Sequence, residues 1–289
     1  MFEIGPGQGA LTKFLVDVGA VVVAVEKDDT YAKELVANVS SEKGFADRKG
    51  RDNDMKLRVF NDDVLNWLPL TSNDPNLFWA EFESYSSGDR DPPVADEIKE
   101  KAVAIGNIPY NITKPLLQLM LPRSDIFSQV ILMLQLETAN RLVSASPGDP
   151  DYRAFSTFVQ YYCQETKILS TIDRSAFNPK PRVDSAVVRF KLKDPSARAF
   201  YMNIDDEKNA NSHPRSGRGD AMEKKFHGFV RLAFSNRRKM LRKTLSSNFD
   251  VKLVEEALAD ADLKITARPQ ELDAHDFVRL YQNLLKSSS

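Results

Sequence analysis

The first nine residues of the chain, Met-Phe-Glu-Ile-Gly-Pro-Gly-Gln-Gly, constrain its fold more than any other stretch. A short apolar run there leads directly into a turn that contains Gly5, Gly7 and Gly9. Glycines at this spacing let the backbone bend tightly and approach a ligand without an intervening Cβ atom. The pattern is typical of a buried strand that ends in a cofactor-binding loop.

The residues after the turn predict a helix and then a second strand. Apolar residues recur at helical spacing, as in a helix packed on a sheet, at Leu11, Phe14, Leu15 and Val18. Residues 20–25 are mostly β-branched and indicate a strand buried on both faces. This strand ends at Glu26, 21 residues after Gly5. In nucleotide-binding α/β folds an acid at that place accepts hydrogen bonds from ribose hydroxyls.

The order of strand, glycine turn, helix, strand and acid indicates an adenosine-containing cofactor. The alternative is a tight turn in a sheet that binds no ligand. The spacing of Gly5, Gly7 and Gly9 also differs from the G-x-G-x-x-G pattern of dinucleotide-binding enzymes, and this difference argues against NAD.

Length and composition exclude several kinds of site. The chain has 289 residues, which is room for a core-forming domain and a smaller one. Its single cysteine, Cys163, excludes a disulfide framework and a zinc site built from several thiolates. The three histidines (His213, His227 and His275) lack metal-ligand spacing, so we expect no metal. No run approaches 18 apolar residues, so we expect no membrane span.

The net charge of −1 conceals a separation of charge along the chain. Eight basic residues and no acid lie between positions 224 and 243: Lys224, Lys225, Arg231, Arg237, Arg238, Lys239, Arg242 and Lys243. Apolar residues lie between them at helical intervals, so one helix face can pack while another carries charge. A basic helix of this kind is expected to bind a nucleic-acid backbone, and the alternative is a solvated helix face.

Strands alternate with helices over the first two thirds of the chain. This order predicts an α/β fold with a mostly parallel sheet covered on both faces. Further strands are expected at 57–60, 102–105, 130–134 and 183–192, and helices at 115–121, 251–258 and 276–285. We predict a domain at 1–193 with polar insertions near 43–56 and 71–100, a polar linker at 194–222 and a helical domain at 223–289.

The segment Gly-Asn-Ile-Pro-Tyr-Asn at 106–111 follows the strand predicted at 102–105. Ligands of α/β sheets bind at the carboxyl ends of strands, so Asn107, the Ile108 carbonyl and the Tyr110 ring would meet there. The two acceptors would hold the hydrogens of an amino group on a flat ring, with the ring stacked on tyrosine and the nitrogen lone pair aimed at an electrophile. Such catalysis rests on positioning. The alternative is a simple strand-ending turn.

Taken in order, these motifs resemble the ribosomal RNA adenine dimethyltransferase family, and the likeness covers nearly the whole chain. The stretches that carry it are 3–9, 25–28, 107–113, 140–143, 160–163, 177–188 and 233–242. The resemblance implies a Rossmann-like class I methyltransferase sheet, a small all-α C-terminal domain and S-adenosylmethionine as cofactor. The implied reaction dimethylates the exocyclic amines of two adjacent adenosines near the 3′ end of small-subunit rRNA, with a role in ribosome biogenesis.

The resemblance also implies roles for individual residues. The cofactor-binding residues would be Glu3, Gly5, Gly7, Gly9, Glu26, Asp63 and Asn107, with Asp62 as a rival to Asp63 for the adenine amino group. The catalytic centre would comprise Asn107, Ile108, Pro109, Tyr110 and Phe177, with the rings of Tyr110 and Phe177 on either side of a flipped adenine. The RNA backbone would be bound by Arg237, Arg238, Lys239, Arg242 and Lys243.

The sequence departs from the family pattern in places. Members normally carry further residues before the glycine turn, including a Gln-x-Phe-Leu segment, so we expect an incomplete gene model or a protein that has lost part of its site. Leu136 stands where bacterial relatives commonly have lysine, and Arg153-Ala154 replaces a Gly-Arg pair. Residues 121–127, 237–244 and 266–272 look most like the plastid branch. A chloroplast location follows, with the mitochondrion and a bacterial-type cytoplasm as alternatives.

The implied partner is small-subunit rRNA in a pre-30S-type ribosomal particle, and we expect a monomer that needs no membrane. Two other functions compete with the methyltransferase. One is a non-catalytic RNA-binding assembly factor or transcription factor derived from the same fold, which the basic helix would suit. The other is a methyltransferase that modifies a different adenine, in mRNA or DNA.

Overall fold

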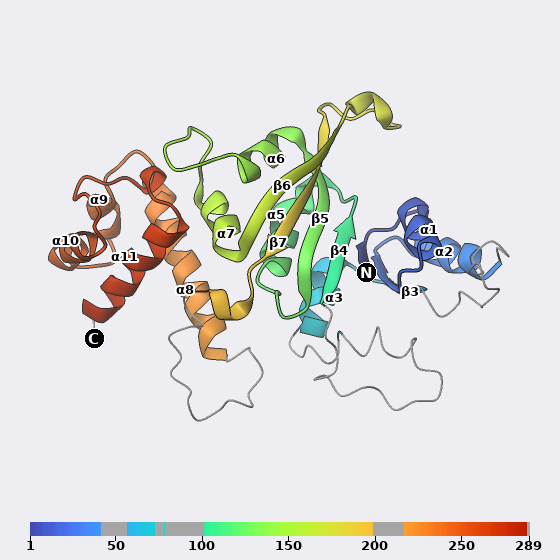
Figure 1. Cartoon of the computed structure of the whole chain (residues 1–289), viewed down its shortest axis with the longest axis horizontal. Helices are drawn as coiled ribbons and strands as arrows, with labels where there is room; N and C mark the ends of the chain where they lie inside the picture. Colours follow the sequence, from blue (N-terminus) through green and yellow to red (C-terminus); the bar gives the residue numbers. More distant parts are fainter. Residues whose placement is uncertain (42–56, 73–77, 79–100, 199–216, 288–289) are drawn as a thin grey trace. The chain divides into compact units, whose positions relative to one another are not determined.

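The computed structural model describes residues 1–41, 57–72, 78, 101–198 and 217–287 (Figure 1). The chain forms two compact units: unit 1 comprises Met1–Leu136 and Lys167–Leu192, and unit 2 comprises Glu137–Thr166 and Lys193–Ser289. The predicted insertions at 43–56 and 71–100 and the predicted linker at 194–222 lie largely outside the described residues. The predicted domain ranges stay a prediction. They differ from the compact units in where they place residues 137–166.

A seven-stranded sheet with the order β3-β2-β1-β4-β5-β7-β6 forms the core of unit 1 (Figure 1). Its strands are β1 (Phe2–Ile4), β2 (Val22–Glu26), β3 (Leu57–Asn61), β4 (Ala102–Gly106), β5 (Phe127–Gln135), β6 (Cys163–Ile172) and β7 (Ser185–Leu192). The first five in chain order are parallel, and β7 runs antiparallel to β5. The predicted α/β class with a mostly parallel sheet is confirmed.

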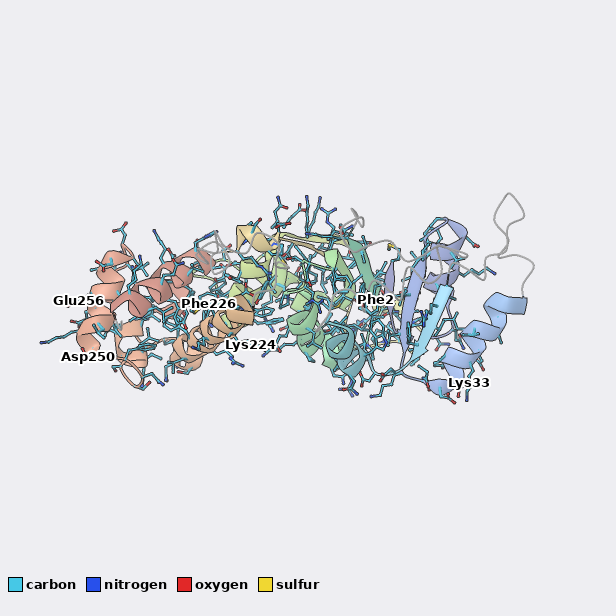
Figure 2. All side chains as sticks on the ribbon, turned by 90° about the horizontal axis from the view of Figure 1, so that it is seen from below. Phe2, Lys33, Lys224, Phe226, Asp250 and Glu256 are labelled. Atoms are coloured by element: carbon cyan, nitrogen blue, oxygen red, sulfur yellow. The ribbon has the colours of Figure 1, made fainter. Side chains whose placement is uncertain are left out.

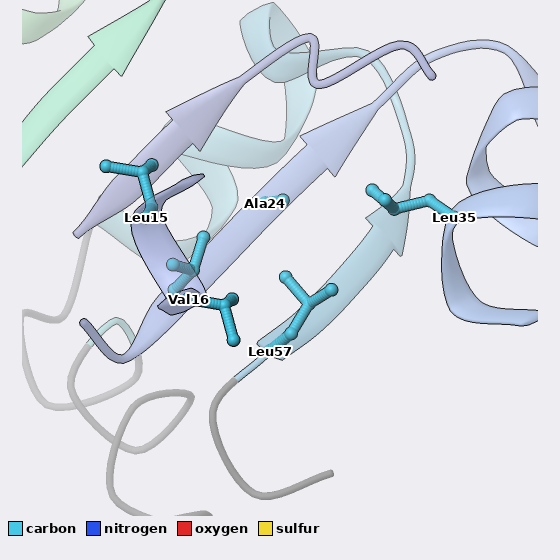
Figure 3. Close-up of a cluster of buried hydrophobic side chains, with 6 residues drawn as sticks. Leu15, Val16, Ala24, Leu35 and Leu57 are labelled. Carbon is cyan, nitrogen blue, oxygen red and sulfur yellow. The ribbon is translucent and has the colours of Figure 1, made fainter. Parts of the chain in front are cut away.

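Helices α1 (Ala10–Asp17) and α2 (Asp29–Ser41) pack on one face of the sheet. The buried cluster between them and the strands contains Leu15, Val16, Val22, Ala24, Leu35 and Leu57 (Figure 3). The strand residues in this cluster recur at every second position, as expected when alternate side chains point to one face of a sheet. The apolar sequence pattern therefore fixes which face of β2 lies under α1 and α2.

Helices α3 (Val64–Ser72) and α5 (Thr113–Met120) lie beside each other and belong to the opposite layer. The Phe2 ring stacks on Trp67 of α3 with centroids 5.4 Å apart, and Phe127 of β5 lies 5.7 Å from Phe2. Phe2 lies among the packed side chains of unit 1, whereas Lys33 projects from α2 (Figure 2). All three residues of β1 are buried, and β1 lies between β2 and β4, so the first residues of the chain form a central strand of the sheet.

Two details of the sequence-based prediction are wrong. Helix α1 buries Thr12, Leu15 and Val16, whereas Phe14 and Val18 of the predicted apolar stripe are more than 60% exposed. The helix carries two apolar faces, and periodicity alone does not choose between them. Strand β6 was not predicted, because its sequence is mostly polar. It is an edge strand whose side chains largely face solvent, so it lacks the apolar alternation of a core strand.

Unit 2 is mainly helical and is held together by a buried carboxylate. Its helices are α6 (Leu136–Val143), which begins at the last residue of unit 1, α7 (Ala154–Tyr162), α8 (Gly217–Ala233), α9 (Leu241–Leu245), α10 (Val251–Asp260) and α11 (Ala274–Ser287). Glu223 of α8 accepts hydrogen bonds of 3.0 Å from the hydroxyls of both Tyr161 and Tyr162. Arg198 lies 3.5 Å from the same carboxylate. A buried charge needs partners of this kind, and they fix α8 to α7.

The helices of the described ranges include none that is both long enough and apolar enough to cross a bilayer. His227 of α8 is half-buried, and its loss of solvation, with the nearby Arg231 and Arg198 charges, lowers its pKa to about 3. Its ring nitrogen Nε2 lies 2.9 Å from the Tyr162 hydroxyl. This histidine is therefore a neutral part of the unit 2 core.

Candidate active site

The parallel strands bring the predicted site residues to one edge of the sheet. Ile4 at the end of β1 pairs with Val25 of β2 and with Gly106 of β4, and Glu26 pairs with Asn61 of β3. The chain therefore leaves β1, β2, β3 and β4 at the same edge. Glu26 is the last residue of β2, and the glycine turn, the two adjacent aspartates and the Asn-Ile-Pro-Tyr segment follow the ends of β1, β3 and β4. This is the edge at which open α/β sheets bind ligands.

The glycine turn has a backbone that only glycine adopts without strain. Gly5, Gly7 and Gly9 have φ angles of +61°, +54° and +84°. A Cβ atom at Gly9 would lie 2.3 Å from Leu35 Cδ1, so this glycine also allows α2 to approach the turn. No described atom lies within 4 Å of a Cβ added at Gly5 or Gly7. The backbone of these two residues therefore faces open space, as a loop that receives a ligand requires.

Glu26 ties the glycine turn to the end of β2. Its Oε2 accepts a hydrogen bond of 2.8 Å from the Gly7 N–H, and its Oε1 accepts one of 2.8 Å from the Asp28 N–H. The Asn61 side chain donates to the Glu26 carbonyl at 3.0 Å and joins β3 to the same corner. Each carboxylate oxygen has two lone pairs, so one acceptor site on each remains for a ligand hydroxyl.

Glu3 is an ionisable group in an otherwise apolar layer. Its register partners Ala24 and Ile105 belong to the face covered by α1, and its side chain is only 1% exposed. Burial raises its pKa to about 7; the nearby Thr12 hydroxyl partly opposes this, and the Glu26 charge adds to it. Glu3 Oε2 has no hydrogen-bond partner among the residues that the structure describes. A buried acid of this kind is a mark of a functional site.

The two aspartates after β3 differ in their partners. Asp63 Oδ1 accepts from the Leu65 N–H at 3.0 Å, in the first turn of α3, and Oδ2 forms an ion pair with Lys27 at 2.9 Å. The Lys27 ammonium and the Leu65 N–H lower the Asp63 pKa. Asp62 Oδ1 accepts from the Asp63 N–H at 2.6 Å. Both carboxylates lie at the site edge, and neither is buried.

The Asn-Ile-Pro-Tyr segment follows β4 as predicted. A Cβ atom at Gly106 would lie 2.9 Å from the Ile4 carbonyl oxygen, so this glycine allows the end of β4 to approach β1. Asn107 is exposed and Ile108 is buried, while Pro109 precedes the short helical turn η4 (Tyr110–Ile112). Within the described residues, the Asn107 side chain has no hydrogen-bond partner. Its amide is therefore available to a ligand.

Phe177 lies in the loop between β6 and β7, directly after the turn η5 (Arg174–Ala176). Because β7 begins opposite the end of β5, with Ser185 paired to Gln135, this loop emerges at the same edge of the sheet as the Asn-Ile-Pro-Tyr segment. The Tyr110 hydroxyl lies 2.7 Å from Ser185 Oγ. The structure thus brings Tyr110 to the base of the loop that carries Phe177.

The predicted RNA-binding residues lie in unit 2 and divide into two kinds. The Arg237 guanidinium donates to Gln270 Oε1 at 2.9 Å, to the Pro150 carbonyl at 2.6 Å and to the Asp149 carbonyl at 3.4 Å. Arg242 donates to Glu255 Oε1 at 2.9 Å. In contrast, the three remaining side chains of the predicted set (Arg238, Lys239 and Lys243) are exposed to solvent.

A cavity of about 620 Å³ lies beside this basic segment. Its lining consists of Ser235, Asn236, Arg237, Arg238, Lys239, Arg268 and Gln270. Four of these seven side chains are cationic and none is acidic, so the cavity suits an anion such as a backbone phosphate. Arg268 was not predicted as an RNA-binding residue, because it lies 29 positions after Lys239 and outside the basic run.

The family model described as "Ribosomal RNA adenine dimethylase" matches residues 1–204. The chain belongs to the ribosomal RNA adenine dimethylase family. A curated relative from Protochlamydia amoebophila, a ribosomal RNA small subunit methyltransferase A, is 34% identical over 99% of this chain and 82% of its own length. The chloroplastic ribosomal RNA small subunit methyltransferase of Arabidopsis thaliana is also 34% identical, over 97% of this chain and 69% of its own length.

Solved structures show the same fold. A dimethyladenosine transferase from Plasmodium falciparum superposes with a TM-score of 0.67 at 21% identity, over 99% of this chain and 90% of that one. The 23S rRNA methyltransferase ErmE gives a TM-score of 0.57 at 22% identity, over 98% of this chain and 89% of that one. The predicted family, the Rossmann-like methyltransferase fold and the class of enzyme, an rRNA adenine dimethyltransferase, are confirmed.

Two residues that contact the candidate active site were not predicted from the sequence. Asn61 joins β2 to β3 below Glu26, and Ser185 contacts Tyr110. The sequence did not indicate a role for Asn61, because asparagine is common in the turns that follow strands. Ser185 lies inside the specific stretch at 177–188, but nothing in that stretch says which residue it contacts.

Proposed function

We propose that this chain transfers methyl groups from S-adenosylmethionine to the exocyclic amines of two adjacent adenosines near the 3′ end of small-subunit rRNA. The observation that carries the proposal is the shared edge at which the glycine turn, Glu26 and the Asn-Ile-Pro-Tyr segment follow parallel strands. The proposed donor pocket and the segment proposed to hold the target amine then lie side by side at one edge of the same sheet. The role in ribosome biogenesis follows from the substrate.

The open backbone at Gly5 and Gly7 and the free acceptor sites of Glu26 fit an adenosine-containing methyl donor. In the proposed arrangement, Glu26 accepts hydrogen bonds from the ribose hydroxyls, and Gly5, Gly7 and Gly9 line the pocket beside Glu3. Asp63 binds the adenine amino group, with Asp62 as the rival. S-adenosylmethionine supplies an electrophilic methyl carbon on a sulfonium centre.

The target amine is held by the Asn107 side-chain oxygen and the Ile108 carbonyl, with Pro109 fixing the turn between Ile108 and Tyr110. These two acceptors align the amine so that its nitrogen lone pair faces the methyl carbon, and Tyr110 and Phe177 stack on the two faces of the flipped adenine. With the donor bound, the nitrogen would form its new bond to the methyl carbon as the carbon–sulfur bond breaks, S-adenosylhomocysteine would leave, and the nitrogen would lose a proton to solvent. No strong base is needed, because positioning supplies most of the rate.

The proposed partner is small-subunit rRNA in a pre-30S-type particle, bound through the basic segment that carries Arg237, Arg238, Lys239, Arg242 and Lys243. The exposed members of this set, together with Arg268, would contact phosphates, since cations on one surface neutralise a nucleic-acid backbone. A monomer suffices for this arrangement. We propose the chloroplast as the location, which the Arabidopsis relative supports.

The proposal is tested by methyl transfer from labelled S-adenosylmethionine to undermethylated small ribosomal subunits. We expect N6,N6-dimethyladenosine at two adjacent positions near the rRNA 3′ end, and an almost complete loss of product with Asn107→Ala. Glu137→Gln, which changes an exposed acid of α6, serves as the matched control. Salt-sensitive RNA binding with no measurable affinity for S-adenosylmethionine would favour a non-catalytic assembly factor. Preferential methylation of mRNA or duplex DNA would favour a different adenine substrate.

A further inference from the structure

The hydrogen bond between Tyr110 and Ser185 joins two segments that are 75 positions apart. Ser185 is fully buried at the first position of β7, so its hydroxyl has a fixed place. The Tyr110 ring follows β4, and its hydroxyl is the only polar atom that can orient the ring from its far end. A separation of 2.7 Å is an ordinary hydrogen-bond length between two hydroxyls.

The neighbouring residue, Asp184, holds the Phe177 loop from the same point. Its carbonyl accepts from the Leu136 N–H at 2.9 Å, which fixes the start of β7 against the end of β5. Its Oδ1 accepts from the Arg174 N–H at 3.1 Å, and the Arg174 guanidinium donates to the Arg182 carbonyl at 3.1 Å. The turn η5 that begins at Arg174 leads directly into Phe177.

The segments that carry the two aromatic rings are therefore both held by hydrogen bonds to two consecutive residues, Asp184 and Ser185. Tyr110 contacts Ser185 through its hydroxyl, and Phe177 follows a turn anchored on Asp184. Ser185 is the first residue of β7 and Asp184 directly precedes it, whereas each ring lies on a loop or a short turn. Two rings can stack on both faces of a flat base only when the distance between them stays constant. Attachment of both segments to the same two residues keeps this distance constant.

We propose that Ser185 and Asp184 are positioning residues that set the spacing of the Tyr110 and Phe177 rings around the target adenine. The inference rests on the proposed function, because it assumes that the two rings hold the base. Neither residue touches the reacting atoms. Ser185 acts through the Tyr110 hydroxyl, and Asp184 acts through the Arg174 turn.

The test is a double-mutant cycle on methyl transfer to undermethylated small subunits, with Ser185→Ala, Tyr110→Phe and the double variant. Tyr110→Phe keeps the stacking ring and removes only the hydroxyl. We expect each single change to lower kcat about three- to tenfold, the range that one neutral hydrogen bond supplies, with the KM for S-adenosylmethionine unchanged. The double variant should be no slower than the slower single variant, because both changes remove the same interaction.

A second readout separates positioning from general loss of structure. A loosely held base presents its amine less reproducibly, so the ratio of monomethyladenosine to dimethyladenosine should rise in Ser185→Ala. Asp184→Ala should behave likewise, and should have no further effect when Phe177 is already alanine. Ser170→Ala, at an exposed serine of β6, is the control and should match the wild type in rate and product ratio.

Multiplied losses in the double variant, or single variants with wild-type kcat and product ratio, would overturn the inference. Should Ser185→Ala fail to fold, Tyr110→Phe removes the same hydrogen bond from the other side and carries the test alone. Wild-type protein that binds S-adenosylmethionine but transfers no methyl group would overturn the proposed function and this inference with it. Normal wild-type transfer with unaffected variants would overturn the inference only.

Discussion

The Glu26 carboxylate accepts a hydrogen bond of 2.8 Å from the backbone N–H of Gly7. This contact links the end of β2 to the glycine turn across 19 positions of sequence. The acid proposed to bind ribose hydroxyls therefore also holds the loop that lines the same pocket. Binding and pre-organisation depend on one side chain, and a change at Glu26 should affect both.

Glu26→Gln should weaken S-adenosylmethionine binding by roughly 10- to 100-fold, since hydrogen bonds to a charged group are worth about 1.5–3 kcal/mol. The amide keeps one acceptor oxygen and replaces the other with a donor, which would face the N–H of either Gly7 or Asp28. Calorimetric titration with the donor measures the change. Glu137→Gln is the control, because Glu137 is an exposed acid paired only within its own helix. Equal donor affinity in Glu26→Gln and the wild type would contradict the role of Glu26.

Gly9→Ala should destabilise the fold by roughly 2–4 kcal/mol. The new Cβ would lie 2.3 Å from Leu35 Cδ1, and the φ angle of +84° is strained for alanine. Gly19→Ala separates these two causes, because Gly19 has a φ angle of +92° but no described atom within 4 Å of the added Cβ. It should cost only about 1–2 kcal/mol. Denaturant unfolding measures both variants, and equal losses would show that the contact with Leu35 is unimportant.

Glu3 should make the stability of the protein fall with rising pH. Its pKa of about 7 in the folded protein lies above the ordinary value of 4.5, so the folded state holds a proton that the unfolded chain has lost. The contribution is fully present below pH 4.5 and is lost as the pH rises through about 7. Glu3→Gln mimics the protonated acid. At pH 8 it should be more stable than the wild type by roughly 3 kcal/mol, at 1.36 kcal/mol per pKa unit.

The difference between Glu3→Gln and the wild type should nearly vanish at about pH 3.5, below the ordinary pKa of 4.5, where the acid is mostly protonated in both states. Free energies of unfolding by urea at several pH values measure this. Glu137→Gln should show no such pH-dependent difference. A constant difference between Glu3→Gln and the wild type from pH 4.5 to 8 would show that Glu3 keeps its charge when buried.

The sequence predicts where the proposed donor-side residues lie in the fold, because the signals for their positions are local. Gly5 and Gly9 need positive φ angles, Glu26 ends a β-branched run, and Asn107 follows another strand directly. Parallel strands in one sheet then place their carboxyl ends together without further information.

Side-chain contacts between segments far apart in the sequence could not be predicted from such local patterns. The contact of Ser185 with Tyr110 spans 75 positions and depends on the antiparallel pairing of β7 with β5. The direction of the Arg237 guanidinium depends on Gln270, 33 positions away. The predicted set treated Arg237 and Arg238 alike, because charge along a sequence does not reveal which side chain turns inward.

Arg237 and Arg238 should therefore respond differently to the same substitution. Arg238→Ala should lower RNA affinity and reduce the slope of log affinity against log salt by about 1, with an unchanged free energy of unfolding, because an exposed side chain is removed. Arg237→Ala should cost about 1–3 kcal/mol of stability, because Gln270 and the carbonyls of Asp149 and Pro150 lose their donor. Filter binding to small-subunit rRNA at several salt concentrations and denaturant unfolding measure the two effects. Arg237→Ala with wild-type stability and a reduced salt slope would mean that its guanidinium leaves these partners to contact phosphate.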